Sequence, residues 1–430
     1  MGRDDHRRMG DCQKGIHLSP RSLGRLIPLL LLLPLSPTLS SSLPDHPVRV
    51  GADVLLEKRL SVVRGKRIGL ITNQSGRTSS GEHILDALLR RGIHVTALFA
   101  PEHGIRGTGE AGEAVADSID AITHIPIYSL YGRNRKPTPS MLAGVDMLLY
   151  DIQDVGARFY TYVSTLGLCM EAAAGKGVPI VVLDRPDPLG GLLTDGPLLP
   201  DSLRSFVGKF PLPVVYALTA GELAEMANGE GWLTGGVRAD LTVIPMEGWT
   251  RAMRWDDTGL RWSPPSPNIR TPQAALVYTA TCYLEATNVS EGRGTESPFQ
   301  IIGAPFVDGR DPDGLLSLSH PGAVLVRDTV FTPASSKFSG EKCSGVRIDF
   351  IMSDSLRPVR IGLRILSLLK KTCKDSFMVD RAGLSHLLGD PEALGLIVRG
   401  ESPDAISARW EPALAAFRVR ASMYHIYPER

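Results

Sequence analysis

Cysteine is scarce in this chain, and the few cysteines it has form no recognisable motif. Its 430 residues include five, none of them in a Cys-x-x-Cys pair. This pattern indicates neither a zinc cage nor a dithiol redox site, and it is not a disulfide framework. Cys169 lies in an apolar stripe with helical spacing, which predicts a core position. Cys343 and Cys373 could pair in an oxidising compartment, and the sequence leaves that open.

A strong net charge is also missing. The 47 Lys and Arg residues nearly balance the 46 Asp and Glu residues, so bulk charge predicts no attraction to nucleic acid or to a membrane surface. The composition is that of a soluble globular protein. A chain of this length fits about two or three domains, and we expect two.

Residues 1–42 differ from the rest and have the features of a secretory signal peptide or leader. Six basic residues precede the apolar run 26–35, which is shorter than the about twenty residues that a membrane-spanning helix needs. We therefore expect an exported protein, periplasmic or extracellular, with no stable membrane insertion after cleavage. Ser40 and its neighbours could supply the cleavage site, although no Ala-x-Ala pattern is present. The alternative is an apolar tail docked on the fold, for which the basic flank has no packing reason.

From residue 49 to about residue 245, short apolar runs alternate with amphipathic stretches, which predicts repeated βα units on a mostly parallel sheet. The expected strands are 67–72, 95–100, 146–152, 180–184 and 241–245. The expected helices are 81–92, 161–176 and 220–229. We therefore predict an α/β fold with a Rossmann-like, doubly wound catalytic domain over residues 48–248.

The remainder of the chain is expected to form a connection and a second domain. Residues 249–271 are rich in Trp, Pro and Asp without a clear period, which indicates a connection or a lid. Beyond them we expect helices at 274–285 and 359–371 and strands at 323–326 and 346–350. This mixture predicts a smaller α+β auxiliary domain over residues 272–430.

Polar residues follow each of the first four expected strands. Ligands of open α/β sheets bind beyond the carboxyl ends of the strands, so these residues should meet at one edge and line a cleft. Carboxylates, amides, arginines and tyrosines together suit a sugar better than an apolar ligand. The side chains concerned include Asn73, Gln74, Glu102, His103, Arg106, Asp151, Asp154, Arg158 and Tyr160.

Each candidate also has a purely structural interpretation. Glu102 could cap its Gly-containing loop, but a carboxylate fixed there beside a histidine is costly to hold without a use. His103 could support Glu102, touch substrate or satisfy a buried carbonyl. Asp151 and Asp154 could be hydrogen-bonded strand ends. Arg158 could form a structural ion pair or bind an anionic group. We favour the functional interpretation for Glu102 and leave the others open.

A second polar cluster occupies residues 285–296, directly after an expected helix. Its two glycines and its charges exclude a core position. A solvated surface loop is the simpler interpretation. Its place between the two expected domains would also let it face the cleft.

Six motifs follow one another along the chain: Gly69-Leu-Ile-Thr-Asn-Gln-Ser-Gly76, Ala100-Pro-Glu-His-Gly-Ile-Arg-Gly107, Asp151-Ile-Gln-Asp-Val-Gly-Ala-Arg-Phe-Tyr-Thr-Tyr162, Leu183-Asp-Arg-Pro-Asp-Pro-Leu-Gly-Gly191, Pro264-Pro-Ser-Pro-Asn-Ile269 and Glu285-Ala-Thr-Asn-Val-Ser-Glu-Gly-Arg-Gly-Thr-Glu296. Together they resemble the exo-β-N-acetylmuramidase family, long carried as a domain of unknown function. The resemblance runs from about residue 48 to the C-terminus. Six ordered motifs are far more specific than a single Gly-rich loop.

The resemblance implies a peptidoglycan-recycling glycoside hydrolase. Its substrates would be peptidoglycan-derived muropeptides or disaccharides, from which it releases non-reducing-terminal N-acetylmuramic acid. The family's proposed catalytic acid/base is the Glu of Ala-Pro-Glu-His-Gly, which is Glu102 here. The auxiliary domain would help to bind substrate. No second catalytic residue is carried over.

Glycoside hydrolysis needs a carboxylic acid to protonate the leaving oxygen, and usually a second carboxylate. Glu102 fits the acid, with His103 beside it. The candidates for the second carboxylate are, in order of preference, Glu296, Glu291, Asp151 and Asp154.

Substrate binding is expected to involve arginine, because a guanidinium pairs with a carboxylate through two hydrogen bonds. Arg158 or Arg293 could bind the lactyl carboxylate that distinguishes muramic acid from glucosamine. The other expected substrate-binding residues are Asn73, Gln74, Arg106, Tyr160, Asn268 and Asn288.

Three rival functions predict other sequence features or other behaviour. A metal-dependent hydrolase using Glu102, His103 and Asp151 would be expected to show a His-x-x-x-His or His-x-Asp pattern, which is not found near them. A dinucleotide-binding protein would leave its first strand through Gly-x-Gly-x-x-Gly and not through residues 73–76. A non-catalytic cell-wall binding protein would bind without turnover. We expect no metal and no cofactor.

Overall fold

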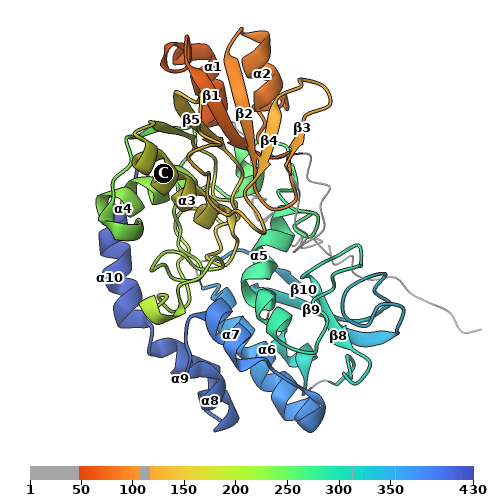
Figure 1. The fold of residues 1–430 in the computed structure, drawn as a ribbon. Coiled ribbons are helices and arrows are strands. Elements are labelled where there is room, and N and C mark those ends of the chain that lie inside the picture. Colours follow the sequence, from red (N-terminus) through yellow and green to blue (C-terminus); the bar gives the residue numbers. More distant parts are fainter. Residues whose placement is uncertain (1–47, 106–116, 312, 321, 354) are drawn as a thin grey trace, which may run out of the picture. The chain divides into compact units, whose positions relative to one another are not determined.

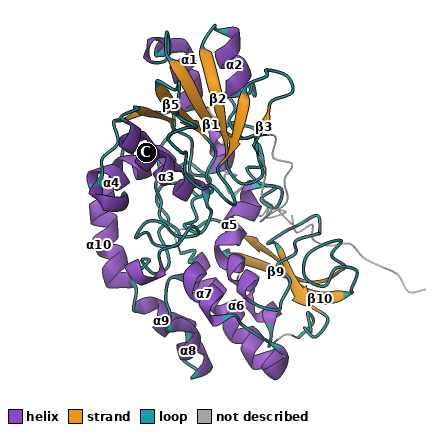
Figure 2. Ribbon diagram, in the orientation of Figure 1, coloured by secondary structure: helices purple, strands orange, loops and turns teal. Residues whose placement is uncertain are grey.

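The computed structural model describes residues 48–105, 117–311, 313–320, 322–353 and 355–430 (Figure 1). The expected leader, Cys12 within it and Arg106 therefore lie outside the described residues. Strands gather in two separate regions of the ribbon, and helices and loops fill the rest (Figure 2). In the described part of the chain, no helix is both long and apolar enough to cross a membrane.

The first region is a seven-stranded sheet in which every neighbouring pair is parallel except β3 with β4. The fold class predicted from the sequence is confirmed. In spatial order the strands are β3 (Ser118–Ile119), β4 (Pro126–Ser129), β2 (His94–Ala100), β1 (Arg67–Thr72), β5 (Met147–Asp151), β6 (Ile180–Leu183) and β7 (Leu241–Ile244).

Helices cover both faces of this sheet because its buried strands are apolar on both sides. In β5, Met147 and Leu149 pack in one apolar cluster, with α1 (Gly51–Lys58) and α2 (Ile84–Arg90). Leu148 and Tyr150 point into the other cluster, with α3 (Tyr162–Lys176) and α4 (Ala220–Gly229). The period of two along the strand thus assigns alternate residues to opposite layers.

The sheet reverses its order between β1 and β5. From β1 the chain passes through α2 to β2 on one side, whereas from β5 it passes through α3 to β6 on the other. Such a reversal opens a crevice at the carboxyl ends of the two strands, where open α/β sheets bind ligands. The loops after these strands therefore occupy the place where a site is expected.

The second region is a small antiparallel sheet with strand order β8, β10, β9 and helices packed on it. Its strands are β8 (Ile301–Ala304), β9 (Val324–Phe331) and β10 (Cys343–Phe350). The helices of this half are α5 (Pro272–Thr281), α6 (Pro358–Cys373), α7 (Arg381–Leu388), α8 (Ala393–Val398), α9 (Pro403–Ala408) and α10 (Glu411–Ser422). The predicted smaller unit of mixed helices and strands is confirmed.

Local signals explain several element ends, and the structure corrects others. Gly177 ends α3 in the left-handed conformation, with φ of 69°. The helix expected at 81–92 begins only at Ile84, because His83 is its N-cap and accepts a hydrogen bond from the Leu85 backbone N–H. The helix expected at 274–285 ends at Thr281 and continues as a 3-10 turn.

The chain end returns to the first sheet after α10. The Tyr427 hydroxyl donates to Asp184 Oδ2 over 2.6 Å and accepts from the Met246 backbone N–H.

The Cys169 side chain is buried, as predicted, and Cys343 and Cys373 both carry free thiols. No disulfide therefore links the described elements.

Candidate active site

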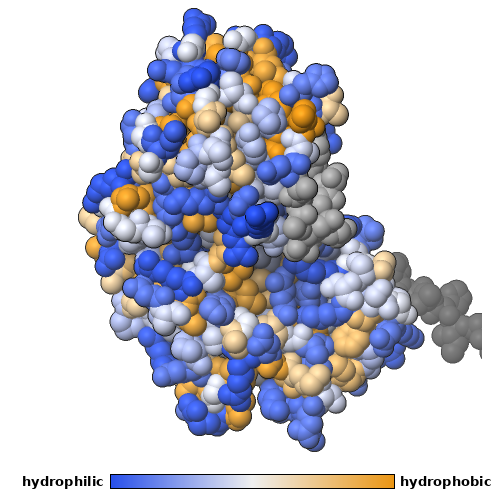
Figure 3. All heavy atoms as spheres, in the orientation of Figure 1, coloured by the Kyte–Doolittle hydropathy of each residue, from blue (hydrophilic) through white to orange (hydrophobic). Residues whose placement is uncertain are grey.

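A cavity of about 750 Å³ lies at the carboxyl ends of the sheet strands and is closed by residues of the second half. We call it the cleft. On the face seen in Figure 3 the molecule is mostly hydrophilic, with separate small apolar patches. Its lining includes the side chains of Glu102, His103, Tyr131, Arg135, Tyr160, Thr161, Phe206, Asn268, Glu285, Glu291, Arg293, Lys337 and Asp380.

The loop after β2 brings Glu102 into the cleft. His103 and Gly104 both adopt positive φ, 73° and 75°, which turns the chain sharply at the strand end. A non-glycine residue rarely adopts this conformation, and such strain is concentrated at functional sites. Glu102 is half-buried, and Thr161 donates its hydroxyl to Glu102 Oε2 over 3.3 Å. The structure thus holds this carboxylate at the cleft wall.

Tyr131 lies against the same carboxylate. Burial raises the pKa of its phenol to about 12, and the charge of Glu102 together with a hydrogen bond to it act in the same direction. The charge of Glu285 raises it further, so Tyr131 is close enough to both carboxylates to respond to each. At neutral pH the phenol keeps its proton and can donate it in a hydrogen bond.

A group of alternating charges forms the opposite part of the cleft. Arg293 contacts two carboxylates, with Nη2 at 2.5 Å from Glu285 Oε1 and Nε at 3.3 Å from Glu291 Oε1. Lys337 Nζ lies 2.9 Å from the other Glu291 oxygen. Arg293 also lies over the Phe299 ring, 5.0 Å from its centroid. Glu291 is therefore buried and neutralised by two cations.

Both glutamates line the cleft, but Glu285 is open to it whereas the side chain of Glu291 is only 3% exposed. The side chain of Glu285 is 32% exposed, yet the surrounding protein raises the pKa of its carboxyl by burial, and Arg293 opposes this rise. The Glu285 side chain is exposed because the cleft is open to solvent on that side. Its pKa is raised because many protein atoms surround it on the other sides. Both descriptions suit a carboxylate that substrate can reach in a partly desolvated site.

The other expected second carboxylates lie outside the cleft lining. Glu296 is 97% exposed and pairs with Arg270 at the surface. Asp151 is buried beneath Arg185, which donates to both of its oxygens over 2.6 and 2.9 Å. Asp154 is buried and accepts hydrogen bonds from Tyr216 and from the Gly156 backbone. Burial raises the pKa of Asp154 to about 6.

Of the expected substrate-binding residues, Tyr160, Asn268 and Arg293 line the cleft. Arg158 does not, because its buried guanidinium donates to the carbonyls of Pro197, Leu212 and Leu387. These bonds join the first half to α7, so the side chain has little capacity left for a ligand.

The three other expected amides have intramolecular partners. Asn73 donates to the Tyr162 hydroxyl, and Gln74 donates to the Pro264 and Pro265 carbonyls. Asn288 holds the backbone of residues 376 and 378. Their predicted contact with substrate stays a prediction, since in the described structure these amides fix loops.

Sequence reasoning missed several residues of the cleft. Tyr131 and Arg135 follow β4, a short strand that is not among those expected from the sequence. Lys337 lies in the loop between β9 and β10. Glu285 is the first residue of the sixth motif, yet it is not among the second carboxylates expected from the sequence. Within the described residues, no group of three or more His, Cys, Asp or Glu side chains could hold a metal ion.

The chain matches known proteins over most of its length. Residues 68–273 match the family described as exo-beta-N-acetylmuramidase NamZ, N-terminal, and residues 276–427 match its C-terminal part. The peptidoglycan beta-N-acetylmuramidase NamZ of Bacillus subtilis (strain 168) is 42% identical over 382 residues, which cover 88% of this chain and 91% of that protein.

Two crystal structures of DUF1343 family proteins from Bacteroides fragilis NCTC 9343 are also similar. One is 34% identical with a TM-score of 0.82, and the match covers 89% of this chain and 100% of that one. The other is 32% identical with a TM-score of 0.72, covering 90% and 100%. The expected family is therefore confirmed: this chain belongs to the NamZ exo-β-N-acetylmuramidases, formerly DUF1343, and is a glycoside hydrolase.

Proposed function

We propose that this protein releases non-reducing-terminal N-acetylmuramic acid from peptidoglycan fragments, with Glu102 as the general acid/base. One observation carries the assignment: Glu102 stands on a strained strand-end loop in the cleft, between the Thr161 hydroxyl and Tyr131. A glycosidic oxygen placed beside this carboxyl would take its proton as the bond to the sugar breaks. The two neighbouring hydroxyl groups would fix its orientation.

For the second carboxylate we propose Glu285. It lines the cleft on the side of the auxiliary half, and Tyr131 responds to its charge as well as to that of Glu102. Glu291 is a weaker candidate because Lys337 and Arg293 already occupy both of its oxygens. In its ionised form Glu285 would stabilise the positive charge that develops on the sugar ring, as nucleophile or as base for water.

For the lactyl carboxylate we propose Arg135. It lines the cleft, is exposed, and lies over the Phe206 ring at 4.5 Å from its centroid. It forms no ion pair with any other described residue, whereas Arg293 already contacts two carboxylates. A free guanidinium fixed on an aromatic ring suits an incoming carboxylate.

Export is part of the proposal. Peptidoglycan lies outside the cytoplasmic membrane, and the basic, apolar N-terminal sequence has the composition of a secretory signal. Fusing residues 1–42 to a reporter that is active only outside the cytoplasm would test this expectation.

The main test is release of the aglycone from a chromogenic β-N-acetylmuramide. The parent should release it, and Glu102→Gln should be slower by about 10²–10⁴-fold because the amide cannot donate the proton. Glu296→Gln is the matched control, since Glu296 is an exposed glutamate away from the cleft. EDTA should leave the rate unchanged. No release by the parent, or equal release by Glu102→Gln, would overturn the proposal.

A further inference from the structure

A second cavity, of about 370 Å³, lies at the same edge of the sheet as the cleft. It opens above the ends of β1, β5 and β6, where the strand order reverses. No residue lines both cavities. Its polar and aromatic lining consists of Ser75, Arg77, Thr78, Ser79, Gln153, Arg185, Trp255, Arg261, Trp262 and Ser263.

The loop that contains Pro264 and Pro265 separates the two cavities. Tyr162 donates its hydroxyl to the Pro265 carbonyl over 2.6 Å, and Gln74 donates to both proline carbonyls. Ser263 and Pro264 line the second cavity, whereas Ser266, Asn268 and Ile269 line the cleft. These hydrogen bonds keep the loop on the sheet edge, so the second cavity is separate from the cleft.

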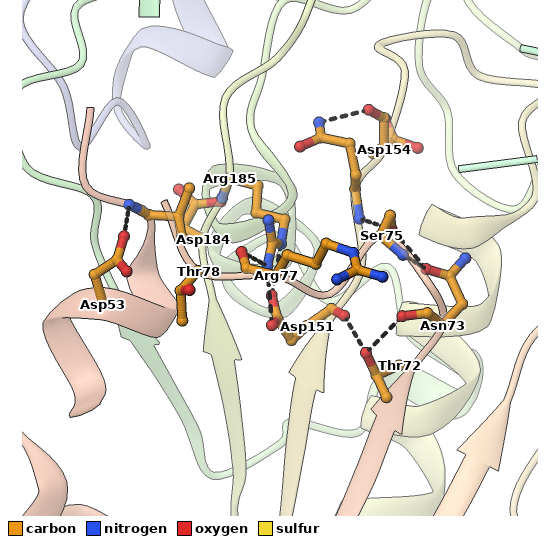
Figure 4. Close-up of polar contacts among 12 residues, drawn as sticks. Asp53, Thr72, Asn73, Ser75, Arg77, Thr78, Asp151, Asp154, Asp184 and Arg185 are labelled. Atoms are coloured by element: carbon orange, nitrogen blue, oxygen red, sulfur yellow. Dashed lines mark hydrogen bonds and ion pairs between the residues drawn. The ribbon is translucent and has the colours of Figure 1, made fainter. Parts of the chain in front are cut away.

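Three arginines line this cavity, and no carboxylate does. Arg77 donates from Nε and Nη1 to carbonyls of its own loop, and Arg185 donates from Nε and Nη2 to Asp151 and the Arg77 carbonyl. Figure 4 shows the two side chains together above Asp151. Each retains a terminal nitrogen that donates to no described residue, and exposed Arg261 adds a third guanidinium.

The cavity also has an acceptor without a partner and an aromatic wall. Gln153 is 3% exposed, and its Nε2 donates to the Asp154 and Pro186 carbonyls. Its Oε1 accepts from none of the described residues, which is costly for a buried carbonyl unless a ligand or water donates to it. Trp255 and Trp262 pack edge to face beside it, with ring centroids 4.7 Å apart.

We propose that this cavity is a second ligand site, which takes a single anionic sugar. The guanidinium groups of Arg77, Arg185 and Arg261 would bind its carboxylate or phosphate. A ring hydroxyl would donate to Gln153 Oε1, and the ring face would lie against Trp262. Ligand pockets span about 300–1,000 Å³, so this volume suits one monosaccharide and leaves no room for a dinucleotide.

Calorimetric titration of the full chain tests the proposal. The probes are N-acetylglucosamine 6-phosphate and glucuronic acid, which distinguish a phosphate from a carboxylate, and neutral N-acetylglucosamine. At least one acidic sugar should bind with a Kd below about 1 mM, and the neutral sugar at least about tenfold more weakly. Absence of binding by both acidic sugars, or equal binding of the neutral one, would overturn the proposal.

Two variants locate the binding. Arg261→Glu should weaken it by at least about tenfold, because it replaces a cation by a like charge to the ligand. Arg64→Glu, at an exposed arginine before the amino end of β1, should bind as the parent does. Unweakened binding by Arg261→Glu would place the sugar elsewhere and overturn the proposal.

Inorganic phosphate and muramide hydrolysis complete the test. If inorganic phosphate bound as tightly as the sugar phosphate, the sugar ring would contribute nothing to binding, and the proposal of a sugar site would be overturned. Both variants should release the chromogenic muramide at the parental rate, since neither residue lines the cleft. Loss of sugar binding and loss of hydrolysis are therefore separate results.

Discussion

The two cavities lie at one edge of one sheet but differ in the charges that line them. The cleft contains four carboxylates, from Glu102, Glu285, Glu291 and Asp380, beside three cations. The second cavity contains three guanidinium groups and no carboxylate. Carboxylates that can hold or release a proton suit glycoside hydrolysis, whereas arginines in a cavity that no carboxylate lines suit capture of an anion. The same strand ends thus support two chemistries.

The largest expected effect after loss of Glu102 is that of Glu285→Gln. If Glu285 is the second carboxylate, hydrolysis of the muramide should slow by about 10²-fold or more. Binding of N-acetylglucosamine 6-phosphate to the second cavity should not change, since Glu285 does not line it. Rate measurements and titration give the two readouts. A parental rate would exclude Glu285 and return Glu291 to consideration.

The pH dependence offers a second test of the cleft. Burial raises the pKa of Glu285, so the ionised form that the reaction needs is lost at a higher pH than for an ordinary glutamate near pH 4.3. The acid limb of kcat/KM should lie above that value. Arg293→Gln removes the attraction that opposes the rise, so the limb should move to still higher pH. A limb that moves down or stays fixed would contradict the assignment.

Arg135→Ala should affect recognition more than chemistry. Losing a charge-assisted contact to the lactyl group should raise KM for the muramide by about tenfold. A β-N-acetylglucosaminide, which lacks the lactyl group, should be hydrolysed as by the parent, whatever that rate is. Arg133→Ala is the matched control because Arg133 is exposed and does not line the cleft. An unchanged preference between the two sugars would exclude Arg135.

The smallest effect on either cavity is expected for Asp154→Asn. Asp154 lines neither cavity, so hydrolysis and sugar binding should be unchanged. Its folded-state pKa of about 6 lies above the unfolded value, so its contribution to stability is present below about pH 4 and lost as the pH rises through 6. In the variant, the free energy of unfolding should no longer include this pH-dependent contribution, which is at most about 3 kcal/mol.

Denaturant unfolding at pH 4 and pH 8 measures this effect. Only part of the dependence should disappear, because burial raises the pKa of Asp184 and of Asp195 to about 6 as well. A stability difference between the two pH values equal to that of the parent would contradict the assignment. Slower hydrolysis by Asp154→Asn would restore Asp154 as a catalytic candidate.

The sheet and its site-bearing edge could be predicted because their signals are local. Apolar strands such as 67–72 alternate with amphipathic helices, and this order alone specifies parallel pairing with crossovers. The same order gives the strand ends, and therefore the exposed place of the loop with Glu102. Six ordered motifs then identified the family.

The partners of each polar residue could not be predicted, because they come from distant segments. Asp151 is the last residue of its strand and Glu102 lies just beyond the end of another, yet Asp151 is buried and paired with Arg185, 34 residues away, whereas Glu102 lines the cleft. Arg158 is held by carbonyls that include one 229 residues away. Glu296 and Glu285 belong to one motif, but only Glu285 turns toward the cleft. Sequence spacing carries no information about such contacts.

The sequence by itself determined the layers, the sheet edge that carries both cavities, and the family. The period of the hydrophobic residues and the order of the elements along the chain are sufficient to predict these features, since both can be recognised from residues close together in the sequence. Only the tertiary structure decided which charges share a cavity. A carboxylate's neighbours determine whether it is neutralised, buried or open to substrate, and those neighbours meet only when both halves of the chain are folded.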